Sequence, residues 1–503
     1  MSVIGLDLGT TACKAIAVNR QGSIIANASI EYTPVKTKEG YVELDPVNVW
    51  ECVKIVLRQI AGQTDKDPAE ALSISALGDT ITPLDSQFNP TYNSLLAFDN
   101  RSVEETNTIG RELGKEWLFQ KTGMPLHTSY SAFQILWLKN KKPSVFSQTK
   151  KFLCYEDYIF AKLGLKEPVI SYADAGRTML FNLKSKKWQP EILSVCGIDA
   201  SYLAKPVQSG TPVGKINPSV ARDIGFSQDN IILVSGGHDQ TCGALGSDVY
   251  KQGSLLDSMG TVECLVMSFD QPVLKEKMMD SDLCCYAHCY PDKYVSIGMI
   301  LTGGASFGWY KNQFGFEDGV LAKKNNRNIY EEMISKFKPE PSRLFFIPHL
   351  SGSGTPRMNP RAKGTLYGLT LGTDKYDIGK SVLEGLNFEI KLNIDIIESL
   401  GISKVKEIKC ISGGARSAFW LQLKADILNK TVLASEFADA PVMGAAILAG
   451  YGAGFFNTLS EGIAATTSKW RSFYPDEKRV AQYQSHYQDY CCIRDLVSEN
   501  LYQ

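Results

Sequence analysis

Hydrophobic positions follow two alternating patterns along the chain, one typical of buried strands and one typical of amphipathic helices. Residues 231–234 form a short apolar run that predicts a buried strand. Residues 378–397 place apolar side chains three or four positions apart, which predicts a long helix that stops at Gly401. Another amphipathic helix is expected after the capping residue Asp45; its inward face consists of Trp50, Val53, Leu57 and Ile60. Strands and helices thus alternate, and we predict an α/β protein.

Two stretches half a chain apart share the order strand, Gly-Thr turn, strand. They are residues 5–18, with Thr10 in the turn, and residues 255–267, with Thr261 in the turn. Self-similarity over so long a period indicates two related lobes. A tight turn of this kind directs backbone N–H groups and a hydroxyl toward an anion, so both turns are candidate phosphate sites.

An acidic residue, Asp239, follows the apolar run at 231–234 after a Gly-Gly turn. It therefore stands at the carboxyl end of a strand, where open α/β sheets bind ligands. The alternative is that Asp239 only caps the next helix, a position for which Asp is well suited. Together with Asp7 and the two phosphate-type turns, Asp239 outlines a nucleotide phosphotransferase.

A second polar strand end follows residues 71–76. Gly78 and Asp79 come directly after this apolar strand, which makes Asp79 a candidate for binding substrate hydroxyls. An ordinary turn explains the same residues equally well. Residues 120–205 contain amphipathic helices and loops, and we expect an insertion that walls a pocket and carries no catalytic machinery.

Glycines at two further turns are candidates for nucleotide contact. Gly304 lies where a strand over residues 294–301 meets a predicted helix, and glycine lets a helix N-terminus approach a ligand closely. Gly414 and Ser417 lie between a strand and the next helix, where the glycine admits a flat base or ribose and Ser417 can cap the helix. The sequence contains neither a Walker-type motif nor G-x-G-x-x-G, so the P-loop and dinucleotide-binding classes lack their motif.

The length of 503 residues exceeds what one hydrophobic core usually supports. We place two domains at residues 1–247 and 248–503, with the helical insertion at about 120–205 in the first. A formal net charge of −1 and the lack of a long basic run give no support for a nucleic-acid or membrane-surface partner. The N-terminus does not resemble a signal peptide and no uncharged run is long enough to span a bilayer, so we expect a cytoplasmic protein.

Twelve cysteines are scattered through the chain, and without a secretory signal they are expected to be free thiols. One compact group could bind a metal: Cys284, Cys285, His288 and Cys289. Structural zinc sites usually combine two separated pairs of ligands, so we favour buried thiols over zinc here.

Several ordered blocks resemble the FGGY family of carbohydrate kinases, within the actin-like ATPase superfamily. They cover nearly the whole chain and are residues 5–11, 41–45 with Trp50, 237–240, 260–261, 348–352, 363–370, 413–417 and 444–446. The resemblance implies an α/β fold of two actin-like, ribonuclease H-like lobes. It also implies that Mg-ATP and an open-chain sugar or polyol bind in the cleft between them, with the sugar on the N-terminal side and the nucleotide on the C-terminal side.

The resemblance also implies roles for single residues at matching positions. Asp239 would be the general base, and Asp7 would hold Mg²⁺ through water. Contacts with ATP would come from Thr10, Thr11, Lys14, Thr261, Gly304, Gly414 and Ser417. Contacts with sugar hydroxyls would come from Gly78, Asp79, Asp239 and Gln240.

The blocks disagree about the acceptor sugar. Residues 408–427 are similar to xylulokinases, although these typically carry His at the position of Asp79. Asp79 and Gln240 are closer to polyol kinases such as glycerol kinase, whereas residues 15–22 and 237–239 resemble L-fuculokinase. We expect an ATP-dependent kinase of a small ketose or polyol, with a xylulose-type pentulose first and L-fuculose, glycerol or another polyol as alternatives. A different functional class is a non-kinase actin-like ATPase switch, which needs no side chains that bind a sugar.

A homodimer is one option for the oligomeric state.

Overall fold

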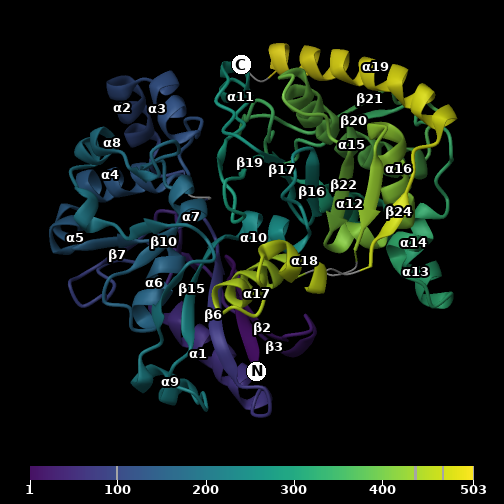
Figure 1. Cartoon of the computed structure of the whole chain (residues 1–503). Helices are drawn as coiled ribbons and strands as arrows, with labels where there is room; N and C mark the ends of the chain where they lie inside the picture. Colours follow the sequence, from purple (N-terminus) through teal and green to yellow (C-terminus); the bar gives the residue numbers. More distant parts are fainter. Residues whose placement is uncertain (98–99, 436–438, 467–468, 502–503) are drawn as a thin grey trace.

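Two mixed β-sheets with helices packed against them form the framework of the chain, seen here in a computed structural model (Figure 1). The structure describes residues 1–97, 100–435, 439–466 and 469–501. Within these residues the first sheet has six strands and the second has seven.

The first sheet has the order β14-β15-β6-β1-β2-β3. Its strands are β1 (Ser2–Leu8), β2 (Ala12–Asn19), β3 (Ile24–Glu31), β6 (Ala69–Ala76), β14 (Pro212–Lys215) and β15 (Ile232–His238). The strands β1, β6 and β15 are parallel, whereas β2, β3 and β14 pair antiparallel with their neighbours. Because parallel strands end at the same edge, the residues that follow β6 and β15 are brought toward the end of β1.

The second sheet repeats this plan. Its order is β18-β19-β17-β16-β22-β23-β24, and its strands are β16 (Ser254–Met259), β17 (Glu263–Phe269), β18 (Tyr286–Ala287), β19 (Tyr294–Ile300), β22 (Glu407–Ile411), β23 (Thr431–Ala434) and β24 (Arg471–Phe473). Read from β19 to β24, successive strand pairs are antiparallel, antiparallel, parallel, parallel and antiparallel. The first sheet, read from β3 to β14, has the same sequence of pairings. The expected pair of related α/β lobes is therefore confirmed.

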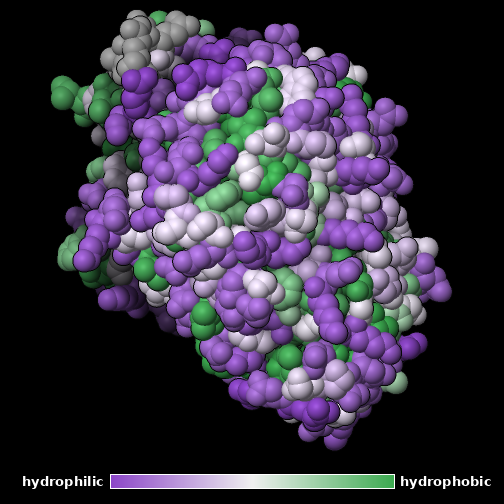
Figure 2. Space-filling model, turned by 90° about the vertical axis from the view of Figure 1, so that its left-hand side faces the viewer, coloured by the Kyte–Doolittle hydropathy of each residue, from purple (hydrophilic) through white to green (hydrophobic). Residues whose placement is uncertain are grey.

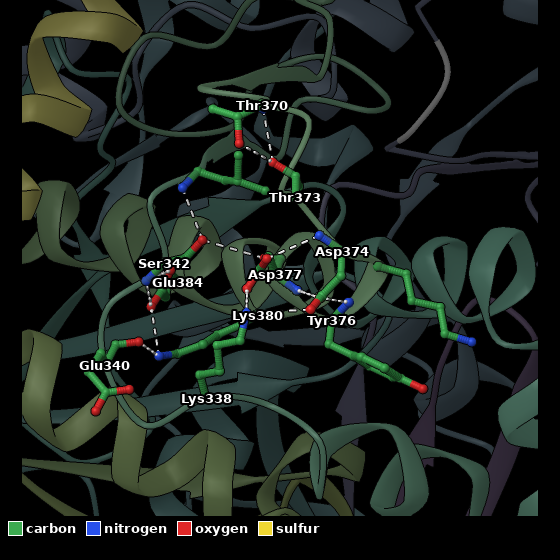
Figure 3. A network of polar contacts seen from close by, with 12 residues as sticks. Lys338, Glu340, Ser342, Thr370, Thr373, Asp374, Tyr376, Asp377, Lys380 and Glu384 are labelled. Carbon is green, nitrogen blue, oxygen red and sulfur yellow. Dashed lines mark hydrogen bonds and ion pairs between the residues drawn. The ribbon is translucent and has the colours of Figure 1, made fainter.

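Amphipathic helices cover the sheets on the faces that the sequence predicts. The helix α1 (Pro46–Gln63) begins after Asp45, whose carboxylate accepts hydrogen bonds from two backbone N–H groups of its first turn, and it buries Trp50, Val53, Leu57 and Ile60. The long helix α15 (Lys375–Ser399) buries Val382, Leu386, Ile390, Ile394 and Ile397. Its first turn carries a capping box within a polar network (Figure 3).

Helices between β6 and β14 build a separate layer beside the first sheet, at the left of Figure 1. They are α2 (Val103–Leu113), α3 (Lys115–Thr122), α4 (Ser131–Lys141), α5 (Pro143–Gln148), α6 (Tyr155–Lys162), α7 (Tyr172–Arg177) and α8 (Pro190–Cys196). This layer coincides with most of the predicted insertion, and α7 packs against β15 and β18.

Two helices from the second half of the chain pack on the first sheet. The helix α17 (Ala440–Gly452) contacts β1, β6 and α10 (Asp239–Gly246), and α18 (Leu459–Thr466) packs against α17 (Figure 1). Val442 and Ile447 of α17 share a hydrophobic cluster with Val3 and Val234. The division at residue 247 remains a prediction, and residues 440–466 pack with the N-terminal half although they lie between β23 and β24 of the second sheet in sequence.

The molecular surface carries hydrophobic residues in interrupted patches among hydrophilic ones (Figure 2). Among the described residues, none of the helices combines the length and apolar character needed to span a bilayer.

Candidate active site

Asp7 lies near the carboxyl end of β1, at the edge where the parallel strands of the first sheet end. Ser75 Oγ donates a hydrogen bond of 2.6 Å to Asp7 Oδ1. Burial raises the pKa of Asp7 to about 6, although Ser75 and Lys14 act in the opposite direction. Lys14, on β2, forms an ion pair of 2.7 Å with Asp439, an acid that the sequence interpretation did not select. The end of β1 is therefore strongly acidic.

Asp239 is the first residue of α10, directly after β15. The N-cap position belongs to His238, so Asp239 is not the cap residue that the alternative interpretation required. Its Oδ1 atom is buried and accepts no hydrogen bond within the described part of the chain. Burial and the carboxylate of Asp7 raise the pKa of Asp239 to about 7, while Gln240 and Arg177 lower it. A carboxylate of this kind can accept a proton near neutral pH.

Asp79 follows β6 in a left-handed backbone conformation, with φ of 65°. Arg177 Nη2 donates to Asp79 Oδ2 over 2.7 Å, whereas Oδ1 is buried and has no partner in the described structure. Burial raises the pKa of Asp79 and Arg177 opposes this rise. The adjacent Gly78 leaves space for its neighbours, because a Cβ atom there would lie 2.5 Å from the ring of His238.

Arg177 is a site residue that the sequence interpretation missed. It ends α7, within the layer that was expected only to wall a pocket. Its guanidinium lies over the rings of Tyr130 and Tyr286, 5.5 Å and 5.2 Å from their centroids, and Nη1 donates to Cys284 Sγ over 3.7 Å. An arginine within an apolar stretch could have signalled this role, since a buried guanidinium requires a charged partner.

The second sheet gathers three of the predicted nucleotide residues around the turn between β16 and β17. Thr261 lies in this turn, and the helix α12 (Gly303–Phe314) starts against it, with Gly304 N–H donating to the carbonyl of Gly260 over 2.8 Å. Gly414 lies against Met259, the last residue of β16. The carbonyl groups of Gly260 and Thr261 thus accept hydrogen bonds from the first turn of α12, which fixes the β16–β17 turn against this helix N-terminus.

The other predicted nucleotide residues have different surroundings. Thr10 and Thr11 lie in the turn between β1 and β2, beside Asp7. Ser417 caps α16 (Ala418–Leu428), accepting a hydrogen bond of 3.3 Å from the N–H of Trp420. The structure therefore divides the predicted nucleotide residues between the ends of both sheets.

A buried charge cluster behind the β16–β17 turn was not anticipated. Lys424 of α16 contacts Asp257 of β16 and lies 2.8 Å from Glu263 Oε1 of β17. Burial and Asp257 raise the pKa of Glu263 to about 8. The cluster connects both strands of the hairpin to α16 and thereby holds the turn in place.

The compact cysteine group does not converge on one point. Cys285 Sγ accepts from the N–H of Val273, His288 Nε2 contacts the carbonyl of Val249, and Cys289 Sγ contacts Thr241 and Cys242. Within the described ranges, no three His, Cys, Asp or Glu side chains are grouped to hold a metal ion.

Comparison with known proteins gives a consistent assignment over both halves of the chain. Residues 2–246 match the N-terminal domain of the FGGY family of carbohydrate kinases, and residues 255–453 match the C-terminal domain of the same family. Together the two matched regions cover most of the sequence.

Individual relatives are similar over almost their full length. The xylulose kinase of Staphylococcus xylosus is 29% identical over 496 residues, which are 98% of this chain and 99% of that protein. The gluconokinase of Bacillus subtilis (strain 168) is 26% identical over 471 residues, 92% of this chain and 90% of that protein. The crystal structure of ligand-bound xylulose kinase from Lactobacillus acidophilus superposes with a TM-score of 0.90 at 26% identity, covering 100% of this chain and 99% of that one.

Proposed function

The chain belongs to the FGGY family of carbohydrate kinases, and we propose that it transfers the γ-phosphoryl group of Mg-ATP to a hydroxyl of a small uncharged ketose. A pentulose of xylulose type is the first choice, because xylulose kinases from several bacteria are similar to nearly the whole chain. L-fuculose, glycerol and other polyols are the alternative acceptors.

The observation that carries this proposal is the buried Oδ1 atom of Asp239, which accepts no hydrogen bond from the described residues although His238 Nε2 lies 3.1 Å away; Arg177, the partner of Asp79, acts on the same carboxylate. Phosphoryl transfer depends mainly on positioning and on stabilising charge. In the proposed step the acceptor oxygen bonds to the γ-phosphorus while the bond to ADP breaks, and Asp239 takes the hydroxyl proton. Such proton transfer typically accelerates a reaction about 10²–10⁴-fold.

The charges of the site favour an uncharged acceptor over an aldonate such as gluconate. Arg177 is already paired with Asp79, and Asp7 and Asp239 add further negative charge nearby. A substrate carboxylate would therefore lie near an arginine whose charge is already neutralised by Asp79, and near the two acids Asp7 and Asp239. The xylulose kinase relatives are therefore a better guide to the acceptor than the gluconokinase relative.

The residues near β1 suit Mg²⁺, which prefers oxygen ligands and usually takes one or two carboxylates, with waters and phosphates completing its shell. Asp7 would hold the ion: its Oδ1 atom accepts a hydrogen bond from Ser75, and no residue in the described part of the chain donates to its other carboxylate oxygen. When bound, Mg²⁺ neutralises phosphate charge during transfer. The phosphates would lie between the turns that carry Thr10, Thr11 and Thr261, with Lys14, Gly304, Gly414 and Ser417 on the nucleotide side.

A non-kinase ATPase switch is the different class that the proposal must exclude. The pair of Asp79 and Arg177 at a strand end argues against it, because a switch needs no hydroxyl-binding groups beside its nucleotide.

The test is ADP release from Mg-ATP with D-xylulose, L-fuculose, glycerol and gluconate, against a reaction without acceptor. We expect stimulation by an uncharged acceptor, D-xylulose first, and none by gluconate. Activity should be lost with EDTA, restored by Mg²⁺, and unaffected by a zinc-selective chelator. ADP release that no acceptor stimulates would contradict the kinase proposal and favour the switch.

A further inference from the structure

Three side chains, two from the first half of the molecule and one from the second, contact one another in a row that includes the candidate base. His238 ends β15 of the first sheet, Asp239 begins α10, and Tyr286 begins β18 of the second sheet. The hydroxyl of Tyr286 lies 2.8 Å from His238 Nδ1, and His238 Nε2 lies 3.1 Å from Asp239 Oδ1. The imidazole thus connects the second sheet to the carboxylate. The distance between Nε2 and Oδ1 is that of an ion pair, but the ring N–H is not aligned for a hydrogen bond.

The carboxylate selects one tautomer of the ring. If Nε2 were unprotonated, its lone pair would face a carboxylate oxygen, so the proton must be on Nε2 and Nδ1 must accept from Tyr286. Burial and the guanidinium of Arg177 lower the pKa of His238 well below its ordinary value, and burial raises the pKa of Tyr286. Both groups are therefore neutral near pH 7.

The ring of His238 has little freedom to turn. It packs edge-to-face on Tyr286 with centroids 5.6 Å apart. On its other side it occupies the space that a side chain at Gly78 would fill. A ring fixed in this way gives its N–H a defined direction, which is what orienting a neighbouring carboxylate requires.

We propose that His238 is a positioning residue that orients the Asp239 carboxylate through Nε2–H, with the Tyr286 hydroxyl from the opposite half of the molecule donating to Nδ1 and so supporting the tautomer that the carboxylate selects. The inference rests on the proposed kinase function, in which Asp239 is the base. The orientation of the Asp239 carboxylate then depends on the contact between β15 and β18. It is correct only when the two halves of the molecule are positioned so that Tyr286 reaches His238.

Removal of this contact should change the titration of Asp239. The groups that face its carboxylate are Asp7 on β1, Arg177 on α7, His238 on β15, Cys264 on β17 and Tyr286 on β18. The N–H of His238 favours the ionised carboxylate, so its loss favours the protonated form of Asp239. The acid limb of kcat/KM for the acceptor should therefore move to higher pH.

The first variant is Tyr286→Phe, which removes one hydroxyl and keeps the ring on Arg177. We expect the acid limb to rise by about half to one pH unit, the size of one hydrogen bond. Tyr483→Phe is the matched control, because the Tyr483 hydroxyl is also buried and donates to Glu384 over 2.8 Å, far from this site. The inference is wrong if the apparent pKa of the acid limb in Tyr286→Phe is the same as in Tyr483→Phe.

A pair of substitutions at His238 separates orientation from packing. His238→Phe keeps a planar ring without a donor, and kcat should fall about 10-fold or more. His238→Gln can place an amide N–H near Asp239 and should recover most of this loss and a normal acid limb. Equal losses in both variants with an unmoved acid limb would reduce His238 to a packing residue and overturn the inference.

A measurement that does not depend on turnover completes the test. The chain contains five histidines, so ¹⁵N-histidine labelling with His238→Gln for assignment isolates one ring by NMR. We expect a neutral Nε2–H tautomer between about pH 6 and 8 that becomes a mixture in Tyr286→Phe. An imidazolium or an Nδ1–H tautomer in the wild type would refute the inference. If no acceptor is phosphorylated, the kinase proposal fails separately, and the NMR result still decides the tautomer.

Discussion

At the scale of single residues, two of the buried polar atoms that lack a hydrogen-bond partner belong to acids of the candidate site. Asp79 and Asp239 each bury a carboxylate oxygen that accepts no hydrogen bond from the described residues. Burial without a partner is costly for a polar group, and Asp79 also has a strained left-handed backbone. Such costs are concentrated where a ligand supplies the missing contacts, so both oxygens are expected to meet acceptor hydroxyls.

The substitution Asp239→Asn tests the general base. The amide keeps the volume but accepts no proton, so kcat should fall about 100-fold or more. Folding should be nearly unchanged, since Asn is tolerated in a first helical turn. The measurements are kcat with the best acceptor, nucleotide affinity and Tm. Activity within about three-fold of wild type would show that Asp239 is not the base.

The wild-type pH profile follows from the same carboxylate. Burial and Asp7 raise the pKa of Asp239 to about 7. The base works only when ionised, so kcat/KM for the acceptor should fall as pH decreases through about 7 and level off above it. The check is a profile at saturating Mg-ATP. A rate that is constant from about pH 5.5 to 8 would contradict this assignment.

Arg177→Gln tests the acceptor wall. The substitution leaves the buried carboxylate of Asp79 without its cation, so KM for the acceptor should rise about 10-fold or more while KM for ATP changes little. Arg494→Gln is the matched control, because it breaks another buried pair, with Glu389 at 2.7 Å. Both variants should have a lower Tm. If KM for the acceptor also rises in Arg494→Gln, the change in Arg177→Gln results from lost stability and not from a lost contact with the acceptor.

At the scale of elements, helix ends are fixed by local polar networks. Figure 3 shows the start of α15, where Asp374 accepts from the N–H groups of Tyr376 and Asp377, and Asp377 accepts from the N–H of Asp374. Lys338 lies 2.8 Å from Asp377 and 3.4 Å from Asp374. This reciprocal cap fixes where α15, a helix of 25 residues, begins.

The capping box gives a stability prediction without a change of mechanism. Asp374→Ala removes the cap acceptor and should lower the free energy of unfolding by about 1 kcal/mol. Asp374→Asn is the matched control, since Asn caps about equally well. Denaturant unfolding of the whole chain measures both, and kcat should be unchanged in each. An Asn variant as unstable as the Ala variant would indicate that charge, through Lys338, outweighs the cap.

At the scale of the whole molecule, the chain crosses between its halves. The helices α17 and α18 lie between β23 and β24 of the second sheet in sequence, but they join the hydrophobic cluster on the first sheet. In addition, Tyr286 of the second sheet contacts His238 of the first. Motion of one half relative to the other must therefore occur around these shared contacts. The site residues lie beside them, which couples ligand binding to the relative position of the sheets.

Closure is the expected response to ligands. Each half carries one phosphate-type turn, at Thr10 and at Thr261. We expect the halves to approach each other so that a single ATP contacts both turns. Small-angle scattering should show a smaller radius of gyration with a non-hydrolysable ATP analogue and acceptor together than with either alone. An unchanged radius under saturating ligands would argue against closure.

The sequence by itself determined the features that have a local signature. The repeated strand–turn–strand units at 5–18 and 255–267 predicted two related lobes, and apolar periodicity predicted the buried faces of α1 and α15. Asp239 was selected because an acid follows the apolar run at 231–234; the predicted glycine turn was wrong, since Gly236 and Gly237 continue the strand β15 up to His238. These signals are local because backbone conformation and side-chain periodicity depend on neighbours in sequence.

Only the tertiary structure decided which distant residues meet. Arg177 and Asp79 are 98 positions apart, and His238 and Tyr286 are 48 apart on different sheets. The return of α17 to the first sheet and the contact of Lys424 with Asp257 and Glu263 are equally remote from any local pattern. Sheet order and helix packing select such pairs, and their hydrogen bonds act between atoms that the sequence order does not bring together.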